Sequence, residues 1–259
     1  MSFDNGDWLF IPKSDIGHRE QQQDRVAVFH SANTESHLLV LADGMGGHEN
    51  GAWAAQTVID IAQQQLQQQE SVQNPAQFLR DICFQAHQTI GEYAGGGRPT
   101  PGSTCVILYL TETEAHWVHV GDSRLYHFRE GELLALTNDH SADQLAKEQV
   151  DETGSIQNHL YMCLGGDNEV SPDYDFTTLS DNDFFLLCSD GFWNQIDVKQ
   201  HFSKDMDKDT LSEYLETLVK QAKQNHADKS DNISLLVAYG ESSPQHRKSR
   251  HRWFRWFKK

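Results

Sequence analysis

The sequence predicts an α+β fold, and three observations support this prediction. Short apolar runs that end in aspartate or glycine recur along the chain, as at 36–42 and 183–188, and are typical of buried strands. Two long helical patterns follow one another without a strand between them. A later series of strands has short polar or glycine connections, which favour antiparallel pairing. We therefore expect antiparallel strands with the helices packed on sheet faces.

The elements are expected in a definite order. After a loop that carries Arg19, the pattern predicts a strand opened by Asp24, a strand over 36–42, helices over about 51–69 and from Pro75 to the glycines at 95–97, strands over 103–112, 115–121, 123–129 and 132–137, a strand over 183–188, a helix over 210–226 and a strand over 232–240. The four strands of 103–137 are interpreted as an antiparallel meander. Between Asn138 and about Gly166 the pattern weakens, and we expect a short helix and a mobile loop that gates the substrate.

Length and composition indicate one sizeable domain without a membrane span. The chain has 259 residues, is 37% hydrophobic, and has no apolar run near the roughly 18 residues that a span needs. Its acidic N-terminus, MSFDNGDWLF, does not resemble a signal peptide, so we expect a cytosolic protein. The scattered Cys83, Cys105, Cys163 and Cys188 are expected to be small buried apolar residues in a reducing compartment.

Charge is distributed unevenly along the chain. The net charge is −17, yet the last fourteen residues, HRKSRHRWFRWFKK, contain seven Lys or Arg and no acid. An acidic body disfavours nonspecific binding to nucleic acid and suits a cation-dependent site. We therefore predict a domain over 1–240 and a separate basic aromatic tail over 241–259.

The stretch LLVLADGMGGHENG (38–51) is the first candidate site. An apolar strand ends at Asp43, and the glycines after it would allow main-chain carbonyls to approach a cation. When this stretch is taken alone, an ordinary strand-to-helix turn is the favoured interpretation, because Asp-Gly is common in turns.

The same pattern recurs, which favours a site. Five aspartates stand at the ends of predicted strands: Asp24, Asp43, Asp122, Asp190 and Asp231. Several carboxylates without a cation would force some of them to bind protons. The five together indicate a site for a hard cation with oxygen ligands.

Eight segments in order, REQQQD, DGMGGH, GST, VGDSR, LTNDHS, LGG, SDGFW and DNIS, resemble the bacterial branch of the metal-dependent protein Ser/Thr phosphatases, the protein phosphatase 2C family. The resemblance spans about residues 17–239. It implies a four-layer α-β-β-α sandwich, in which two antiparallel sheets are stacked face to face and flanked by pairs of helices.

The resemblance also implies a centre of two Mn²⁺ or Mg²⁺ ions. Asp43 would bridge both ions, the Gly44 carbonyl would bind one, and Asp24, Asp190 and Asp231 would complete the ligands directly or through waters. Asp122 matches the residue associated with a third, weaker metal. Arg19 matches the arginine that binds the substrate phosphate, a role that suits its planar fork.

Such a centre suits hydrolysis of a phosphate monoester by a metal-activated water, without a covalent intermediate. The chain also lacks the CxxxxxR loop of a Cys-dependent phosphatase.

The chain departs from the family pattern at several positions. Gln22 is unusual before the first aspartate, and Met45 stands where eukaryotic relatives carry a histidine that serves as leaving-group acid. His48 cannot take that role by position and is interpreted as a loop or helix-start residue. We expect Asp139 and His140 to hold the root of the flap, and Ser103 and Thr104 to pack in the sheet beside the site.

The tail interleaves Arg and Lys with Trp253, Phe254, Trp256 and Phe257. Such segments favour an anionic membrane surface, so peripheral attachment to the inner membrane face is one hypothesis. A docking peptide for a partner, contact with the acidic body and a solvated tail are the alternatives. Pelleting with liposomes, with and without residues 246–259, separates the membrane hypothesis from the rest.

We predict a monomeric bacterial phosphatase that acts on phosphoserine and phosphothreonine in protein substrates and opposes a Ser/Thr kinase. Some family members of this type serve secretion systems, type VI included. Two alternatives stay open: a catalytically silent pseudophosphatase that binds phosphopeptides, and a SpoIIE-like regulator. The retained aspartates disfavour the first, and the short chain, without a sensor module, disfavours the second.

Overall fold

The computed structural model describes residues 3–4, 8–31, 33–46, 49–93, 101–141, 162–166, 169–203, 207–225 and 229–240. Most of the predicted flap, together with Gly47, His48 and the tail 241–259, lies outside the described residues.

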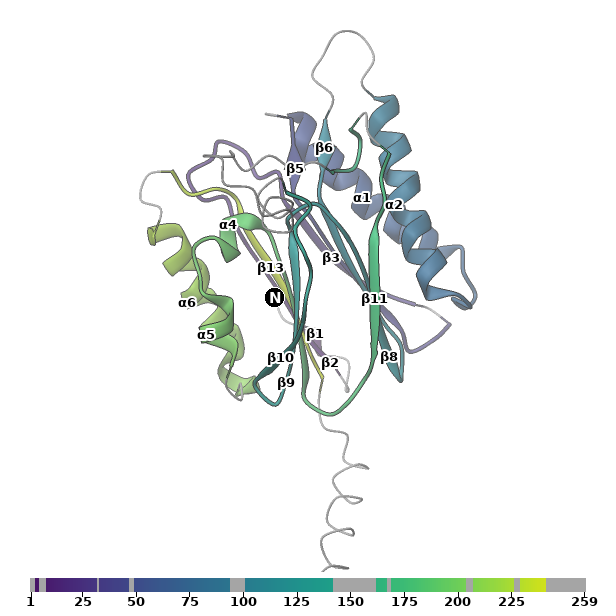
Figure 1. The fold of residues 1–259 in the computed structure, drawn as a ribbon. Helices are drawn as coiled ribbons and strands as arrows, with labels where there is room; N and C mark the ends of the chain where they lie inside the picture. The colour runs from purple at the N-terminus through teal and green to yellow at the C-terminus, as the bar shows by residue number, and fades with distance from the viewer. Residues whose placement is uncertain are drawn as a thin grey trace, which may run out of the picture.

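Two antiparallel sheets form the centre of the molecule (Figure 1). Within the described residues, the larger sheet has six strands in the order β1 (Phe3–Asp4), β2 (Trp8–Asp15), β13 (Ile233–Gly240), β12 (Asp183–Cys188), β9 (Arg124–Arg129) and β10 (Glu132–Leu136). The smaller sheet has five, in the order β11 (Asp173–Thr178), β8 (Glu114–Val120), β7 (Cys105–Leu110), β4 (His37–Ala42) and β3 (Arg25–His30). The short β5 (Gly44–Met45) and β6 (Gly102–Ser103) pair separately.

Helices cover both outer faces of the sheets, so the predicted four layers are confirmed (Figure 1). Beside the smaller sheet lie α1 (Glu49–Gln67) and α2 (Pro75–Glu92). Beside the larger sheet lie α4 (Asp190–Trp193), α5 (Val198–Phe202) and α6 (Lys208–Asn225). The helix α2 begins where the sequence predicts, because Asn74 caps it by accepting a hydrogen bond from the Gln77 N–H and Pro75 occupies its first turn.

Three apolar cores hold the layers together, and the alternation of side chains along each strand sorts residues among them. In β4, Leu38 and Val40 pack against α1 and α2, whereas Leu39 and Leu41 pack between the two sheets. Phe185 of β12 meets them from the larger sheet. Each such side chain contributes roughly 1.5–3 kcal/mol when it is fully buried. A one-residue slip in the pairing of β4 would therefore turn Leu38 and Val40 toward the larger sheet and Leu39 and Leu41 toward the helices.

The predicted meander over 103–137 is wrong. The first two of its strands, β7 and β8, belong to the smaller sheet, whereas β9 and β10 belong to the larger one. The chain changes sheets at Gly121, whose φ of +103° suits glycine and makes a sharp corner. The long helices and the strand over 183–188 lie within about two residues of their predicted bounds, whereas β2 and β11 have no predicted counterpart.

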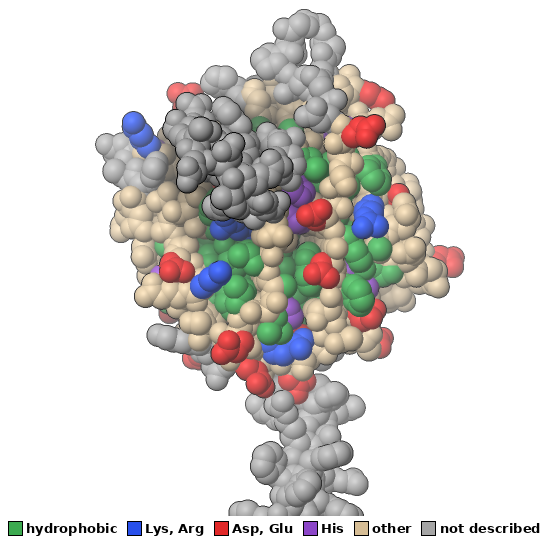
Figure 2. All heavy atoms as spheres, in the orientation of Figure 1, with side chains coloured by type: hydrophobic (Ala, Val, Ile, Leu, Met, Phe, Trp, Pro, Cys, Tyr) green, Lys and Arg blue, Asp and Glu red, His purple; other side chains and the backbone are tan. Residues whose placement is uncertain are grey.

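The surface and the cysteines agree with the composition. On the face in Figure 2, apolar side chains come to the surface where the edges of the two sheets lie, and Leu134 of β10 and Phe176 of β11 are about half exposed. Cys83, Cys105 and Cys188 are buried and form no disulfide, as predicted, whereas Cys163 is only partly buried. None of the helices in the described residues combines the length and apolar character that crossing a membrane requires.

Asp183 is a buried charge that joins β12 to β9. It is fully buried, and its carboxylate accepts hydrogen bonds from His127 Nε2 at 2.8 Å, from Arg129 Nε at 2.7 Å and from the Ser180 N–H at 2.7 Å. Burial by itself would raise the pKa of Asp183, but these donors outweigh it and hold the pKa below its usual value. The ionised Asp183 and its donors therefore stabilise the fold at neutral pH. This contribution is lost as the pH falls through the lowered pKa of Asp183.

We expect Asp183→Ala to lower the free energy of unfolding by about 3–5 kcal/mol, because it leaves the buried His127 N–H without an acceptor and the partly exposed Arg129 without its ion-pair partner. Urea unfolding at pH 7 measures this. Asp181→Ala, two residues away on the turn, is the control and should change stability by less than about 0.5 kcal/mol. Equal effects of the two substitutions would contradict the prediction.

Candidate active site

Five aspartates come together at one end of the sandwich because of the strand directions. Asp43 follows β4, and Asp24 precedes β3, the antiparallel neighbour of β4. Asp190 follows β12 and Asp231 precedes β13, which are also antiparallel neighbours. Asp122 lies at the corner between β8 and β9. This end is the upper one in Figure 1, near α4 and β5. The structure thus brings together all five aspartates that the sequence singled out.

The carboxyl groups interact strongly with one another. Burial, followed by the charges of the other four aspartates, raises the pKa of Asp43 well above its usual value. Burial is also the main cause that raises the pKa of Asp24 and of Asp190 to about 6 and the pKa of Asp122 to about 7. The negative charge of Asp190 adds to the rise at Asp24 and at Asp122. The protein alone therefore does not compensate this much negative charge at neutral pH.

Asp24 has an oxygen without a protein partner. Its Oδ2 accepts a hydrogen bond from Ser189 Oγ at 2.9 Å, whereas its buried Oδ1 has no hydrogen-bond partner among the residues that the structure describes. A buried carboxylate oxygen without a donor is costly unless a cation faces it. The residues present therefore fit a hard divalent cation with oxygen ligands.

Gln22, the departure from the family pattern, positions Asp24. The Gln22 side-chain oxygen accepts a hydrogen bond from the Asp24 N–H at 2.9 Å, and its Nε2 donates to Ser14 Oγ at 2.8 Å and to the Asp15 carbonyl at 3.1 Å. A glutamine at this position thus links the start of β3 to the end of β2.

Asp43 is framed by its neighbours in the smaller sheet. Its N–H donates to Thr104 Oγ1 at 3.1 Å, and its carbonyl accepts from the Thr104 N–H at 2.9 Å and from Ser103 Oγ at 3.1 Å. The predicted position of Ser103 and Thr104 beside the site is confirmed. Gly44 is equally constrained, because a Cβ there would lie 2.0 Å from the Gly51 carbonyl oxygen of α1.

Arg19 lies at the rim of the aspartate cluster. Its guanidinium is well exposed and contacts Asp231 at 2.6 Å, and its positive charge offsets part of the rise in the pKa of Asp190. The preceding Gly17 has a φ of +64° and packs against the Asp231 carbonyl, which fixes the loop before Arg19.

Sequence reasoning missed the role of Asn232 in fixing this loop. Its side-chain oxygen accepts from the Gln23 N–H at 2.7 Å, and its Nδ2 donates to the Ile16 carbonyl at 2.9 Å and to the Gln21 carbonyl at 3.0 Å. Asn232 follows Asp231 in the DNIS segment, and that adjacency was the only signal for it.

Asp139 and His140 have structural contacts, as predicted. Asp139 accepts two hydrogen bonds from Arg124, at 2.8 and 2.7 Å. The His140 N–H donates to the Gly121 carbonyl at 2.9 Å, and the Gly121 N–H donates to His140 Nδ1 at 3.1 Å. Both residues therefore fasten the chain that leads into the predicted flap to the corner that carries Asp122.

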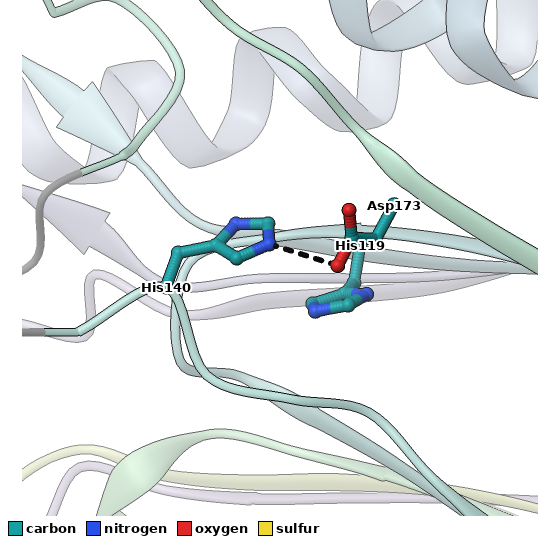
Figure 3. Close-up of side chains that lie close together, drawn as sticks. All are labelled: His119, His140 and Asp173. Carbon is teal, nitrogen blue, oxygen red and sulfur yellow. Dashed lines mark ion pairs between the residues drawn. The ribbon is translucent and has the colours of Figure 1, made fainter. Parts of the chain in front are cut away.

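A second cluster contains His119, His140 and Asp173, whose potential ligand atoms lie within 4.8 Å of one another (Figure 3). His119 Nε2 bonds to the Asn138 carbonyl at 2.7 Å, and His140 Nε2 lies 3.3 Å from Asp173. Because His140 Nδ1 accepts from the Gly121 N–H, its Nε2 carries the proton and offers no lone pair to a metal. We interpret this cluster, which borders a pocket of about 380 Å³, as structural.

Comparison with known proteins agrees with this geometry. The family model described as protein phosphatase 2C matches residues 13–233. The protein phosphatase PhpP of Streptococcus pneumoniae is 31% identical over 251 residues, which cover 90% of this chain and 98% of that protein. The serine/threonine phosphatase stp of Listeria monocytogenes is 26% identical over 230 residues, which cover 85% of this chain and 90% of that protein.

Solved structures are also similar. That of the serine/threonine phosphatase Stp1 from Staphylococcus aureus has a TM-score of 0.78 and 27% identity, covering 90% of this chain and 95% of that chain. That of the catalytic domain of the phosphatase PstP, in complex with two manganese ions, has a TM-score of 0.75 and 26% identity, covering 91% and 99%. The chain therefore belongs to the protein phosphatase 2C family of metal-dependent protein phosphatases.

Proposed function

We propose that this protein hydrolyses phosphoserine and phosphothreonine in protein substrates with two divalent cations, Mn²⁺ or Mg²⁺, and that it opposes a bacterial Ser/Thr kinase. The observation that carries the proposal is the convergence of five aspartates whose pKa values are raised at Asp24, Asp43, Asp122 and Asp190. The family of the chain and the names of its relatives support the same activity.

The cations would be held by carboxylates from both sheets. We assign Asp43 and the Gly44 carbonyl to the centre, with Asp24, Asp190 and Asp231 around them and Asp122 at a third, weaker position. When bound, such cations lower the pKa of a water to make it a nucleophile and neutralise charge on the phosphate.

The side chains of the protein then orient the substrate. Arg19, exposed at the rim and held by Asp231, is placed to receive a phosphate dianion with its fork of N–H donors. Asp231 limits the rotamers of Arg19, which lowers the entropy lost when the phosphate binds. The corresponding binding-only function, a pseudophosphatase, would need Arg19 but not the buried carboxylates of Asp24 and Asp43.

Activity with defined metals tests the proposal. Purified protein should hydrolyse a phosphothreonine peptide with Mn²⁺, and EDTA should abolish the reaction. Asp43→Ala and Asp190→Ala should each lower kcat/KM at least about a hundredfold, which corresponds to about 2.7 kcal/mol of transition-state stabilisation. Asp181→Ala, at the far end of β12, should leave it unchanged. Folded wild-type protein that is inactive with every metal would contradict the proposal.

Substitution of Arg19 should act mainly on phosphopeptide binding. We expect Arg19→Ala to raise KM about tenfold or more, because hydrogen bonds to charged groups contribute roughly 1.5–3 kcal/mol. Arg19→Lys should recover part of this loss, since it keeps the charge but not the fork. Lys220→Ala, a well-exposed cation on α6, is the control. An unchanged KM in Arg19→Ala would exclude the assigned role.

The stability of the metal-free protein should depend on pH. Folding raises the pKa of Asp24 and Asp190 to about 6 and that of Asp122 to about 7, so the folded state binds more protons than the unfolded state between about pH 4 and pH 7. The stabilisation is present at low pH and is lost as the pH rises through these values. In EDTA, Tm should fall from pH 5 to pH 8 by at least about 5 °C.

Mn²⁺ should raise Tm more at pH 8 than at pH 5, because the cation competes with protons for the same carboxylates. Asp122→Asn, which removes one of the raised pKa values, should make the fall in EDTA smaller. Differential scanning calorimetry measures both effects. A metal-free Tm that is constant or rises between pH 5 and pH 8 would contradict the electrostatic account.

A further inference from the structure

The corner of the chain that carries Asp122 is fixed from several sides. Gly121 has a φ of +103°, and a Cβ there would lie 2.6 Å from Thr104 Cγ2, so no other residue fits this conformation. The Gly121 carbonyl accepts a hydrogen bond from the His140 N–H, the Gly121 N–H donates one to His140 Nδ1, and Ser123 Oγ lies 2.7 Å from Thr104 Oγ1. These contacts hold the corner against the smaller sheet.

One contact joins the same corner to the larger sheet. Trp193 Nε1 donates a hydrogen bond to the Asp122 carbonyl at 2.9 Å. Trp193 ends the short helix α4, which begins at Asp190, so the two residues are three positions apart and share one side of a helical turn. The indole therefore spans the distance between the elements that carry Asp190 and Asp122.

The indole ring is held in place by Arg124. The Arg124 guanidinium lies 3.4 Å from the centroid of the Trp193 ring. The guanidinium is held over the ring by two hydrogen bonds to Asp139, at 2.8 and 2.7 Å, and by one to the Tyr126 hydroxyl at 3.2 Å. Stacking of a guanidinium that is fixed on its other edge restricts the rotation of the indole. Trp193, Arg124 and Asp139 form what we call the indole brace.

We propose that the Trp193 indole N–H is a positioning group that sets the Asp122 carboxylate relative to Asp190, and that cation binding at Asp122 depends on it. This inference rests on the proposed metal-dependent function. The peptide carbonyl of Asp122 and its side chain branch from one Cα, so a carbonyl that is tied to Trp193 fixes the backbone from which the carboxylate projects and narrows the positions that the carboxylate can reach. Metal–ligand distances tolerate changes of only about 0.2 Å, so a small rotation of the corner weakens binding.

Mn²⁺ titration of EDTA-stripped protein tests the indole brace, with free Mn²⁺ measured by electron paramagnetic resonance. Asp122→Asn defines the binding step that depends on Asp122. Trp193→Phe keeps an aromatic ring beneath Arg124 but removes the N–H. We expect it to weaken that step about three- to tenfold, the effect of losing one net hydrogen bond, and to leave the tighter Mn²⁺ binding unchanged. Arg124→Lys keeps the positive charge and the indole but removes the planar guanidinium that stacks on the ring, and it should also weaken the binding step that depends on Asp122.

Two controls make the result specific. Trp117→Phe, a buried tryptophan of the core between the sheets, should leave every binding step unchanged. Trp193→Phe added to Asp122→Asn should change nothing further, because the two act on one step. A Trp193→Phe isotherm equal to wild type, or one weakened equally at all sites, would overturn the inference. Wild-type protein that binds no Mn²⁺ would overturn the proposed function itself, which separates the two failures.

Discussion

Repulsion among five carboxylates at one end of the sandwich is the constraint on which the functional part of this structure depends. Strand order places Asp24, Asp43, Asp122, Asp190 and Asp231 together, and burial then makes their charges expensive. Apolar packing elsewhere supplies the stability that permits this. The three cores lie outside and between the sheets. The burial of these apolar side chains offsets the electrostatic cost of the site.

Apart from Asp231, which pairs with Arg19, the aspartates of the site are held by uncharged donors and by backbone. Thr104 bonds to both the N–H and the carbonyl of Asp43, Gln22 fixes the backbone of Asp24, and Trp193 fixes that of Asp122. Such contacts position a carboxylate without neutralising it, which leaves its charge available to a cation. Among the described residues, Arg19 is the cation that pairs with Asp231 and also lowers the pKa of Asp190. Its side chain stays exposed at the rim of the site.

Much of this could be predicted from the sequence, for reasons that differ by element. The strand over 37–42 and its terminal Asp43 are visible because apolar residues run without interruption up to a turn dipeptide. The change of sheet at Gly121 is not visible, because a hairpin and a corner between sheets have the same local pattern. Among the strands longer than two residues, two were missed: β11, DYDFTT, is a half-exposed edge strand with little apolar pattern, and β2 contains Pro12. The indole brace and Asn232 depend on contacts between segments far apart in the chain, which spacing does not reveal.

The central claim is that these aspartates bind the cations on which hydrolysis depends. Its most direct test is a crystal structure of the protein grown with Mn²⁺, with anomalous scattering measured on both sides of the manganese edge. The account predicts two strong anomalous peaks in contact with Asp43, one of them also in contact with the Gly44 carbonyl, and a weaker one at Asp122. Peaks absent from this end of the sandwich, or present instead at His119, His140 and Asp173, would contradict it.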